Sequence, residues 1–314
     1  MNSHPDSLAE LAGEFFLELQ IRNWTEASIY TCKWHIERFL KFLDERSITR
    51  PEELTREVLR EYQLGLVLNP NSRGKRFSPS TINRYMTSVM GFIRFLKSSD
   101  YLIIPSDPEE GITYAKESRK LPREILSKEE MVRLIEAPDI STVLGYRDRT
   151  IMELLYSTAI RRNECRYLKV RDVYFQDHLL RVFGKGRKER MAPIGRIALK
   201  FLEGYISDVR PLLLADPAED SLFLSAKGRP VSKNLMGEFI AKYARWAGID
   251  KRVTPHTFRH TCATLMLRNR ADVRYIQMLL GHESLVSTQI YTHVSAVDLK
   301  EILEKYHPRE KDPD

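Results

Sequence analysis

The sequence has few cysteines, and no part of it is apolar over a long stretch. Cys32, Cys165 and Cys262 lie far apart and form no CxxC pair, so they provide neither a disulfide framework nor a cysteine zinc site. We expect them to be buried as small hydrophobic side chains in a reducing compartment. No stretch approaches the roughly 20 apolar residues that a membrane-spanning helix needs. Residues 1–6 also lack the basic and apolar regions of a secretory signal, so we expect a cytoplasmic protein without a membrane partner.

The composition is that of a folded protein. Hydrophobic residues make up 42% and charged residues 30% of the 314 residues, which excludes a largely disordered chain. The length is enough for two ordinary domains or for one large one. The sequence contains neither an internal repeat nor a low-complexity segment.

Basic residues are unevenly distributed along the chain. Residues 1–115 carry 14 basic and 16 acidic side chains, whereas residues 116–314 carry 36 basic and 27 acidic ones. Two short stretches, 181–196 and 251–274, each hold six basic residues and one acidic residue. Clustered basic charge is typical of proteins that bind a polyanion, most often nucleic acid. A solubilising surface can have the same composition, so the sequence motifs are needed to distinguish the two interpretations.

Residues 1–104 are predicted to form a compact helical domain. A capping box, Ser7-x-x-Glu10, opens its first helix. Between residues 81 and 97, apolar side chains recur with the 3.6-residue period of a helix that packs one face on a core. The preceding loop, 69–78, is rich in Pro, Asn, Ser and Gly and carries three basic residues: Arg73, Lys75 and Arg76.

Residues 105–122 are predicted to be a linker, because prolines and a glycine break any helix there. The second domain, 123–314, opens with another capping box, Ser127-x-x-Glu130. Helical patterns then continue from Arg147 to Arg166.

The pattern changes to that of a β-hairpin after residue 172. Two short strands, Leu180–Phe183 and Arg190–Ile194, flank the glycine-rich turn 184–188. Helical patterns return from about Ala198 to the end, with a short amphipathic helix over 298–306. We therefore expect a mainly α protein with a small antiparallel sheet.

The strongest local motif is HxxR at the start of a predicted helix. Thr254 and Pro255 predict that start, and His256 and Arg259 then lie three residues apart on one face, within reach of a single phosphate. A histidine moves protons near neutral pH, and an arginine can bind two phosphate oxygens. The isolated motif is weak, because HxxR also occurs by chance on surface helices.

Two further signals lie elsewhere in the second domain. Gly281 predicts the end of a helix, with His282 directly after it and Tyr291 nine residues later. A tyrosine in such a place is more often a packing residue than a nucleophile, but polar residues flank this one. Arg161 and Glu164 are three residues apart, so the carboxylate either fixes the guanidinium or forms a surface ion pair.

The order of these residues resembles that of the tyrosine recombinases, the phage-integrase and Xer-like family of site-specific recombinases. The resemblance spans nearly the whole chain and includes the segments GKGRKER and LLGHESLVSTQIYTHV. It implies a SAM-like helical core-binding domain over 7–100, a catalytic domain over 123–305, and a C-shaped clamp that the two form round DNA. The six positions that carry the resemblance are Arg161, Lys185, His256, Arg259, His282 and Tyr291.

The resemblance implies how strands are cut. Tyr291 attacks the scissile phosphate and forms a 3′-phosphotyrosyl link with a free 5′-hydroxyl. Arg161 and Arg259 neutralise charge on the non-bridging oxygens of the transition state. Lys185 protonates the departing 5′-oxygen.

The remaining positions have supporting roles in this scheme. His256 assists proton transfer at Tyr291, His282 donates a hydrogen bond to the phosphate, and Glu164 orients Arg161. The positive side chains supply the charge that a metal otherwise would, so no cofactor is expected. The phosphotyrosyl bond stores the energy for rejoining, so no ATP is expected either.

Three details of the motifs need assignment. The family usually has glycine where this chain has Ala159. Arg161 is assigned ahead of its neighbour Arg162 because it lies three residues before the glutamate, as the family pattern expects. Lys185 fits the glycine-flanked position of the hairpin, and Lys188 is the alternative.

Other basic residues are candidates for contacts with the DNA backbone. We expect helix 81–97 to face the major groove. Solvent-exposed charge without a role in binding is the alternative for each residue. The candidates are Arg73, Lys75, Arg76 and Arg84 in the first domain and Arg187, Lys188 and Arg190 on the hairpin.

The sequence therefore predicts a site-specific recombinase that cuts and rejoins double-stranded DNA as a homo-tetramer on paired sites, with or without a partner recombinase. The alternatives are an accessory DNA-binding protein without catalysis and a type IB topoisomerase-like enzyme. Xer-like dimer resolution and integration or excision of a mobile element share this chemistry. Helix 298–306 docks either on its own domain or on a neighbouring subunit.

Overall fold

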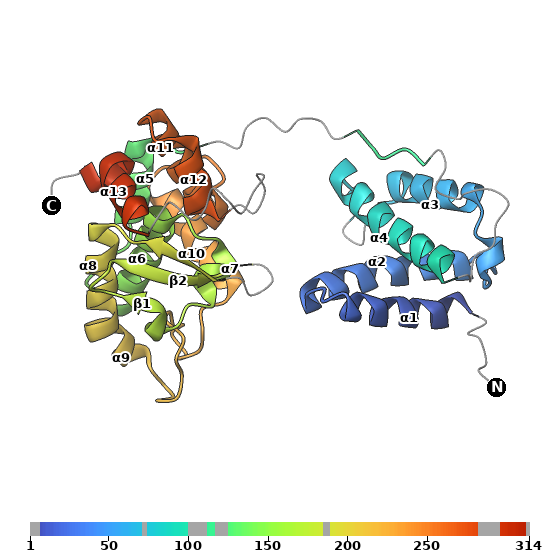
Figure 1. Cartoon of the computed structure of the whole chain (residues 1–314), viewed down its shortest axis with the longest axis horizontal. Coiled ribbons are helices and arrows are strands. Elements are labelled where there is room, and N and C mark those ends of the chain that lie inside the picture. Colours follow the sequence, from blue (N-terminus) through green and yellow to red (C-terminus); the bar gives the residue numbers. More distant parts are fainter. Residues whose placement is uncertain are drawn as a thin grey trace. The chain divides into compact units, whose positions relative to one another are not determined.

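The computed structural model describes residues 7–70, 74–99, 112–116, 125–184, 189–281 and 296–311. They belong to two compact units that divide after Leu121 (Figure 1). Each unit has its own hydrophobic core. Helices dominate both, and the second unit holds a three-stranded antiparallel sheet, which confirms the predicted fold class. None of the helices in these ranges is both long and apolar enough to span a membrane.

The first unit is a bundle of four helices, and a side-chain cap fixes the start of each one. Ser7 and Glu10 form the predicted capping box, and Thr25 and Thr55 accept hydrogen bonds from the first turns of the next two helices. The elements are α1 Leu8–Ile21, α2 Glu26–Asp44, the 3₁₀ turn η1 Pro51–Glu53, α3 Arg56–Leu68 and α4 Pro79–Ser98.

Helix α4 buries its apolar stripe in the first core, as its periodicity predicts. Ser78 caps its start and Pro79 occupies its first turn. Tyr85, Val89 and Phe92 are completely buried. The opposite side of the helix remains polar and exposed, so it is available for contacts outside the bundle.

Residues 112–116 lie against the first unit, although the sequence places them in the linker. The Asn83 side chain donates to the Ala115 carbonyl at 2.9 Å and accepts from the Ala115 N–H at 2.8 Å. Gln63 donates to the Thr113 carbonyl at 2.8 Å, and Ile112 packs on the core. This part of the chain is therefore tied to α3 and α4.

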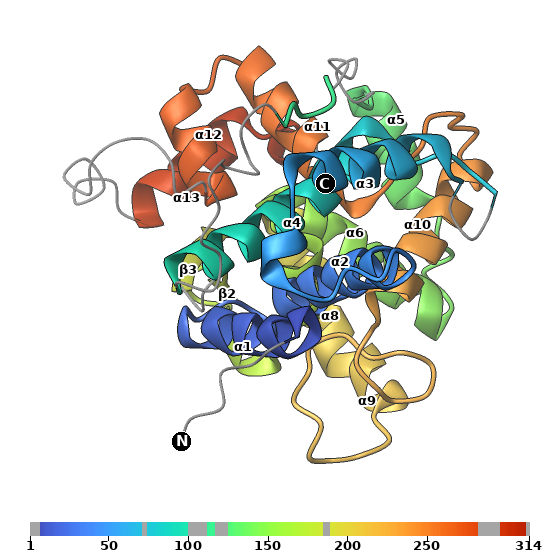
Figure 2. The same cartoon turned by 90° about the vertical axis from the view of Figure 1, so that its right-hand side faces the viewer.

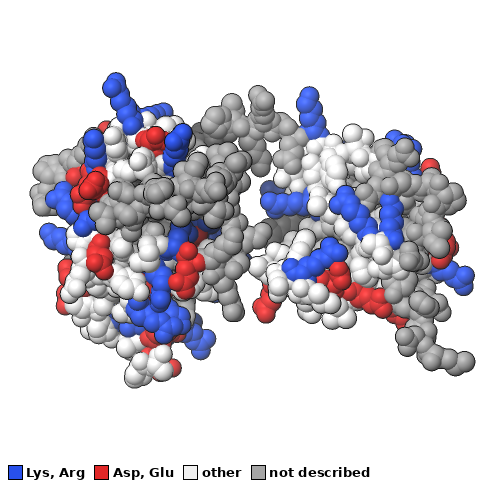
Figure 3. All heavy atoms as spheres, viewed as in Figure 1, with Lys and Arg blue, Asp and Glu red and all other residues white. Residues whose placement is uncertain are grey.

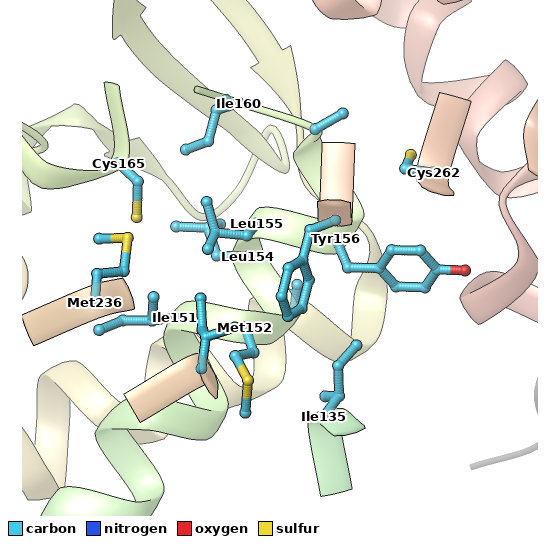
Figure 4. Close-up of a cluster of buried hydrophobic side chains, with 14 of the residues drawn as sticks. Ile135, Ile151, Met152, Leu154, Leu155, Tyr156, Ile160, Cys165, Met236 and Cys262 are labelled. Atoms are coloured by element: carbon cyan, nitrogen blue, oxygen red, sulfur yellow. The ribbon is translucent and has the colours of Figure 1, made fainter. Parts of the chain in front are cut away.

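The second unit is built around α6, which is buried along nearly its whole length. Figure 4 shows its Ile151, Leu154 and Leu155 among side chains from neighbouring elements, with Cys165 beside Met236. All three cysteines are buried, as predicted. The elements are α5 Lys128–Glu136, α6 Val143–Thr158, α7 Arg162–Arg166, η2 Val170–Asp172, β1 Val173–Tyr174, β2 Leu179–Phe183, β3 Glu189–Pro193, α8 Arg196–Gly204, η4 Tyr205–Val209, α9 Arg210–Leu213, α10 Lys233–Trp246, α11 Pro255–Arg268, α12 Val273–Leu280, α13 Ala296–Tyr306 and η5 Pro308–Lys311.

The sheet has the order β1-β2-β3, with both pairs antiparallel. The β2–β3 pair is the hairpin that the sequence predicts, in a register that places Val182 opposite Arg190. Strand β1 was not predicted, because two residues are too few to show a period-2 pattern.

The helical pattern predicted from Arg147 to Arg166 is divided between two helices in the structure. Helix α6 ends at Thr158, and Ala159 adopts the left-handed conformation with φ of 50°. A new short helix, α7, begins at Arg162. This break places Arg161 at the junction of two helices instead of inside one.

The end of the chain docks on its own unit. Leu303 of α13 is buried in the second core, and Figure 2 shows α13 beside α12. The His307 Nε2 lies 3.1 Å from the Tyr156 carbonyl. Arg309 pairs with the buried Glu153 at 2.9 Å. Within the described residues, the tail helix therefore packs in cis.

Candidate active site

Arg259 is held at the beginning of α11 by two backbone carbonyls. Thr254 and Pro255 start this helix as predicted, which places His256 and Arg259 in its first turns. The Arg259 guanidinium donates to the Ala159 carbonyl at 2.8 Å and to the Leu280 carbonyl at 2.6 Å. Its position therefore depends on the break after α6 and on the end of α12.

Arg161 lies next to this guanidinium, with Glu164 as its partner. The Glu164 carboxylate accepts from the Arg161 side chain at 2.8 Å and from its backbone N–H at 2.7 Å. The second terminal nitrogen of Arg161 donates to the Gly281 carbonyl at 3.2 Å. The expected contact between Arg161 and Glu164 is thus present, and Glu164 is buried while the Arg161 side chain is 38% exposed.

Arg190 is a third member of the cluster. The sequence places it on the hairpin as a contact for DNA, but its terminal nitrogens lie 3.0 and 2.9 Å from the two Glu164 oxygens. Directly opposed residues in an antiparallel pair share a face of the sheet, and its partner Val182 is completely buried. Side chains two positions apart on a strand lie on the same face, and Ala192 is buried. This period-2 pattern was the sequence signal that the Arg190 side chain faces the core.

The cluster carries an excess of positive charge. Burial alone would raise the pKa of Glu164, but hydrogen bonds from Arg190 and from the Arg161 backbone lower it to about 2. Burial, followed by the charge of Arg161, lowers the pKa of Arg259 to about 10. An arginine side chain carries a positive charge, and the single carboxylate offsets only one of the three. Two positive charges remain for an anion.

Gly281 joins α12 to this cluster. It ends α12 in the left-handed conformation with φ of 59°, which confirms the predicted C-cap. A Cβ atom at this position would lie 2.7 Å from the Arg190 Nε, so a larger residue has no room. The carbonyl of Gly281 holds Arg161, and the residue that follows it in the sequence is His282.

The structure brings together Arg161, Glu164, Arg190 and Arg259 and places His256 on the exposed side of the same helix as Arg259. Lys75, Arg76 and Arg84 are exposed in the first unit. In the view of Figure 3, basic side chains lie over both units, mixed with acidic ones. The predicted site residues outside the described ranges are Arg73, Lys185, Arg187, Lys188, His282 and Tyr291.

Arg84 lines a pocket between α2 and α4. The pocket has a volume of about 420 Å³, and Trp24, Thr31 and Thr87 also line it.

Among the described residues, no group of three or more His, Cys, Asp or Glu side chains is arranged to hold a metal ion. The guanidinium donors of Arg161 and Arg259 in the second unit fit an anion.

Comparisons with known proteins show the family to which the chain belongs. Residues 124–297 match the model of the phage integrase family. The tyrosine recombinase XerD of Staphylococcus haemolyticus is 34% identical over 294 residues, which cover 94% of this chain and 96% of the relative.

Two solved structures share the fold. The XerH site-specific recombinase bound to palindromic difH substrate has a TM-score of 0.66 at 22% identity, covering 90% of this chain and 81% of XerH. A lambda integrase tetramer bound to a Holliday junction has a TM-score of 0.66 at 17% identity, covering 92% of this chain and 78% of the integrase. The chain therefore belongs to the phage integrase family and is a site-specific tyrosine recombinase, an enzyme that cleaves and rejoins DNA.

Proposed function

We propose that the cluster of Arg161, Arg259, Arg190 and Glu164 is the binding place of the scissile phosphate. The observation that carries this proposal is the unbalanced charge of three guanidiniums around one carboxylate. A phosphodiester supplies one negative charge, and its transition state for transfer gathers more on the non-bridging oxygens. Rigidly held guanidiniums stabilise that charge without having to reorganise.

Strand cleavage then follows the scheme that the motifs imply. The Tyr291 oxygen attacks phosphorus, a 3′-phosphotyrosyl bond forms and the bond to the 5′-oxygen breaks. His256 assists removal of the tyrosine proton, and Lys185 gives a proton to the leaving 5′-oxygen. His282 donates to the phosphate. Attack by a 5′-hydroxyl reverses these steps and joins the new strand.

We propose that α4 of the first unit contacts DNA through its exposed polar side. Arg84 and Thr87 are exposed on this helix, and the start of α2 provides the other wall of the pocket beside them. Exposed Lys75 and Arg76 precede α4 and suit contacts with phosphates. Arg73, Arg187 and Lys188 remain candidates on sequence grounds, and the clamp remains a prediction of the resemblance.

We further propose that the enzyme assembles as a homo-tetramer on paired sites in double-stranded DNA. The lambda integrase tetramer on a Holliday junction supports this assembly by its fold. Two uses share the chemistry, Xer-like dimer resolution and integration or excision of a mobile element. Recombination of two sites on one plasmid, compared with two sites on separate molecules, distinguishes resolution from integration.

Covalent trapping tests the proposed chemistry. A binding site is first selected from a pool of randomised duplexes, and a nick is then placed near the cleavage position so that the product strand diffuses away. We expect wild-type protein and a Tyr275→Phe control to form a covalent band on a denaturing gel, and Tyr291→Phe to form none. A band that survives in Tyr291→Phe refutes the assignment of the nucleophile. Specific binding without any band favours an accessory protein.

A further inference from the structure

Arg190 is turned away from solvent, at the start of the strand that follows the hairpin turn. Its side chain is 19% exposed, and its two terminal nitrogens bind both oxygens of Glu164. Its Nε is buried, and no described residue accepts a hydrogen bond from it. A residue held in this way is poorly placed to bind the DNA backbone from the surface.

Arg161 and Arg190 compete for one carboxylate. Arg161 places one terminal nitrogen on Glu164 and the other on the Gly281 carbonyl, and it is twice as exposed as Arg190. Arg190 makes the bidentate contact, which is the stronger arrangement for a guanidinium and a carboxylate. Most of the Glu164 charge is therefore balanced by Arg190.

Arg190 also touches both groups that hold Arg161. It binds Glu164, and it packs against Gly281, which has no space for a Cβ because of this contact. The position of Arg161 thus depends on Arg190 from two sides.

We propose that Arg190 is a positioning residue for recombination, which neutralises Glu164 so that Arg161 keeps its positive charge for the scissile phosphate. This inference rests on the proposed function. If Arg190 is removed, Glu164 pairs with Arg161 alone and cancels one of the two positive charges that face the phosphate. Glu164 then opposes cleavage instead of supporting it.

The test compares Arg190→Met with Arg181→Met. Arg181 is a matched control, since it lies on the neighbouring strand β2 and pairs with the buried Asp172 at 2.8 Å. The formation of the covalent complex is timed at saturating protein on two nicked duplexes. One has the natural scissile phosphate, and the other has a methylphosphonate there, in which a methyl group replaces one non-bridging oxygen and removes the charge.

We expect Arg190→Met to slow cleavage of the phosphate duplex by at least about tenfold, because one charge facing the transition state is lost. On the methylphosphonate it should stay within about threefold of wild type, since no phosphate charge needs Arg161. DNA affinity and the Arg181→Met control should change little on either duplex. Adding Glu164→Gln to Arg190→Met should restore much of the rate, because the unbalanced carboxylate is gone.

Three results overturn the inference. An equal loss on both duplexes shows that Arg190 only supports the fold, and a loss of affinity that matches the loss of rate shows a direct DNA contact. A wild-type rate for Arg190→Met on the natural duplex shows that Glu164 needs no second arginine. If Arg190→Met fails to fold, Arg190→Lys and the double variant are measured on the same two duplexes. Wild-type protein that forms no covalent complex refutes the proposed function, and this inference with it.

Discussion

The charge of Glu164 should stabilise the second unit, and the effect can be measured through its pH dependence. The carboxyl is 5% exposed and its pKa is lowered to about 2 in the folded protein. A lowered folded-state pKa stabilises the fold above the unfolded value of about 4.5, and this stabilisation is lost as the pH falls toward 2. The difference corresponds to about 3 kcal/mol at pH 7.

We therefore expect Glu164→Gln to lower the free energy of unfolding of this unit by about 3 kcal/mol at pH 7 and by about 2 kcal/mol at pH 3.5. Urea unfolding followed by the fluorescence of Trp246, in chains that carry Trp24→Phe and Trp34→Phe, reports on the second unit alone. The control is Asp220→Asn in the same unit, whose partner Lys169 is in an exposed pair. There we expect no measurable change, because solvent screens the pair.

The comparison between pH 7 and pH 3.5 tests whether the pKa of Glu164 is lowered in the folded protein. Other carboxyls titrate in both proteins and cancel in the difference between wild type and Glu164→Gln. A difference that is the same at pH 7 and pH 3.5 refutes the lowered pKa. A difference close to zero at pH 7 refutes the claim that Arg161 and Arg190 are stabilised by this carboxylate.

Three other substitutions test the surroundings of the site by the same unfolding assay. Gly281→Ala should cost about 1–2 kcal/mol for the left-handed backbone alone and should also slow covalent trapping, since the new Cβ strikes Arg190; an unchanged protein contradicts both arguments. Ala159→Gly should leave the midpoint of urea unfolding nearly unchanged. The relieved backbone strain, about 1 kcal/mol, offsets the lost burial of a methyl group, about 0.8 kcal/mol. A large shift of the midpoint in either direction contradicts this estimate. Arg309→Met should destabilise the unit by about 3 kcal/mol because the buried Glu153 loses its ion pair at 2.9 Å and keeps the longer one with Arg149 at 3.2 Å. Arg171→Met, which breaks an exposed pair in the same unit, is the neutral control.

The sequence predicted those elements that are determined by residues close together in the chain. The stripe of α4, the capping boxes at Ser7 and Ser127 and the hairpin of β2 and β3 follow from local chemistry. The start of α11 at Pro255 and the end of α12 at Gly281 do as well. All of these depend on residues within a few positions of one another.

Features that depend on contacts across the chain were not predictable in this way. The break at Ala159 forces a left-handed backbone on a residue that disfavours it, and only the packing around α6 and the bond to Arg259 compensate. Arg190 resembled a surface residue because basic neighbours surround it in the sequence. Its alternation with buried Ala192 indicated which face of the strand carries its side chain. Its partner Glu164 is 26 residues away, so no local pattern connects the two.

The burial of all three cysteines has a practical consequence for experiments on this enzyme. Burial raises the pKa of all three thiols, and it raises that of Cys262 to about 12. These thiols stay protonated and shielded at neutral pH, so maleimide reagents should leave the native chain unmodified. A cysteine introduced at exposed Ser98 would then be the single reactive thiol. A fluorophore attached there would report how the first unit moves when DNA is bound.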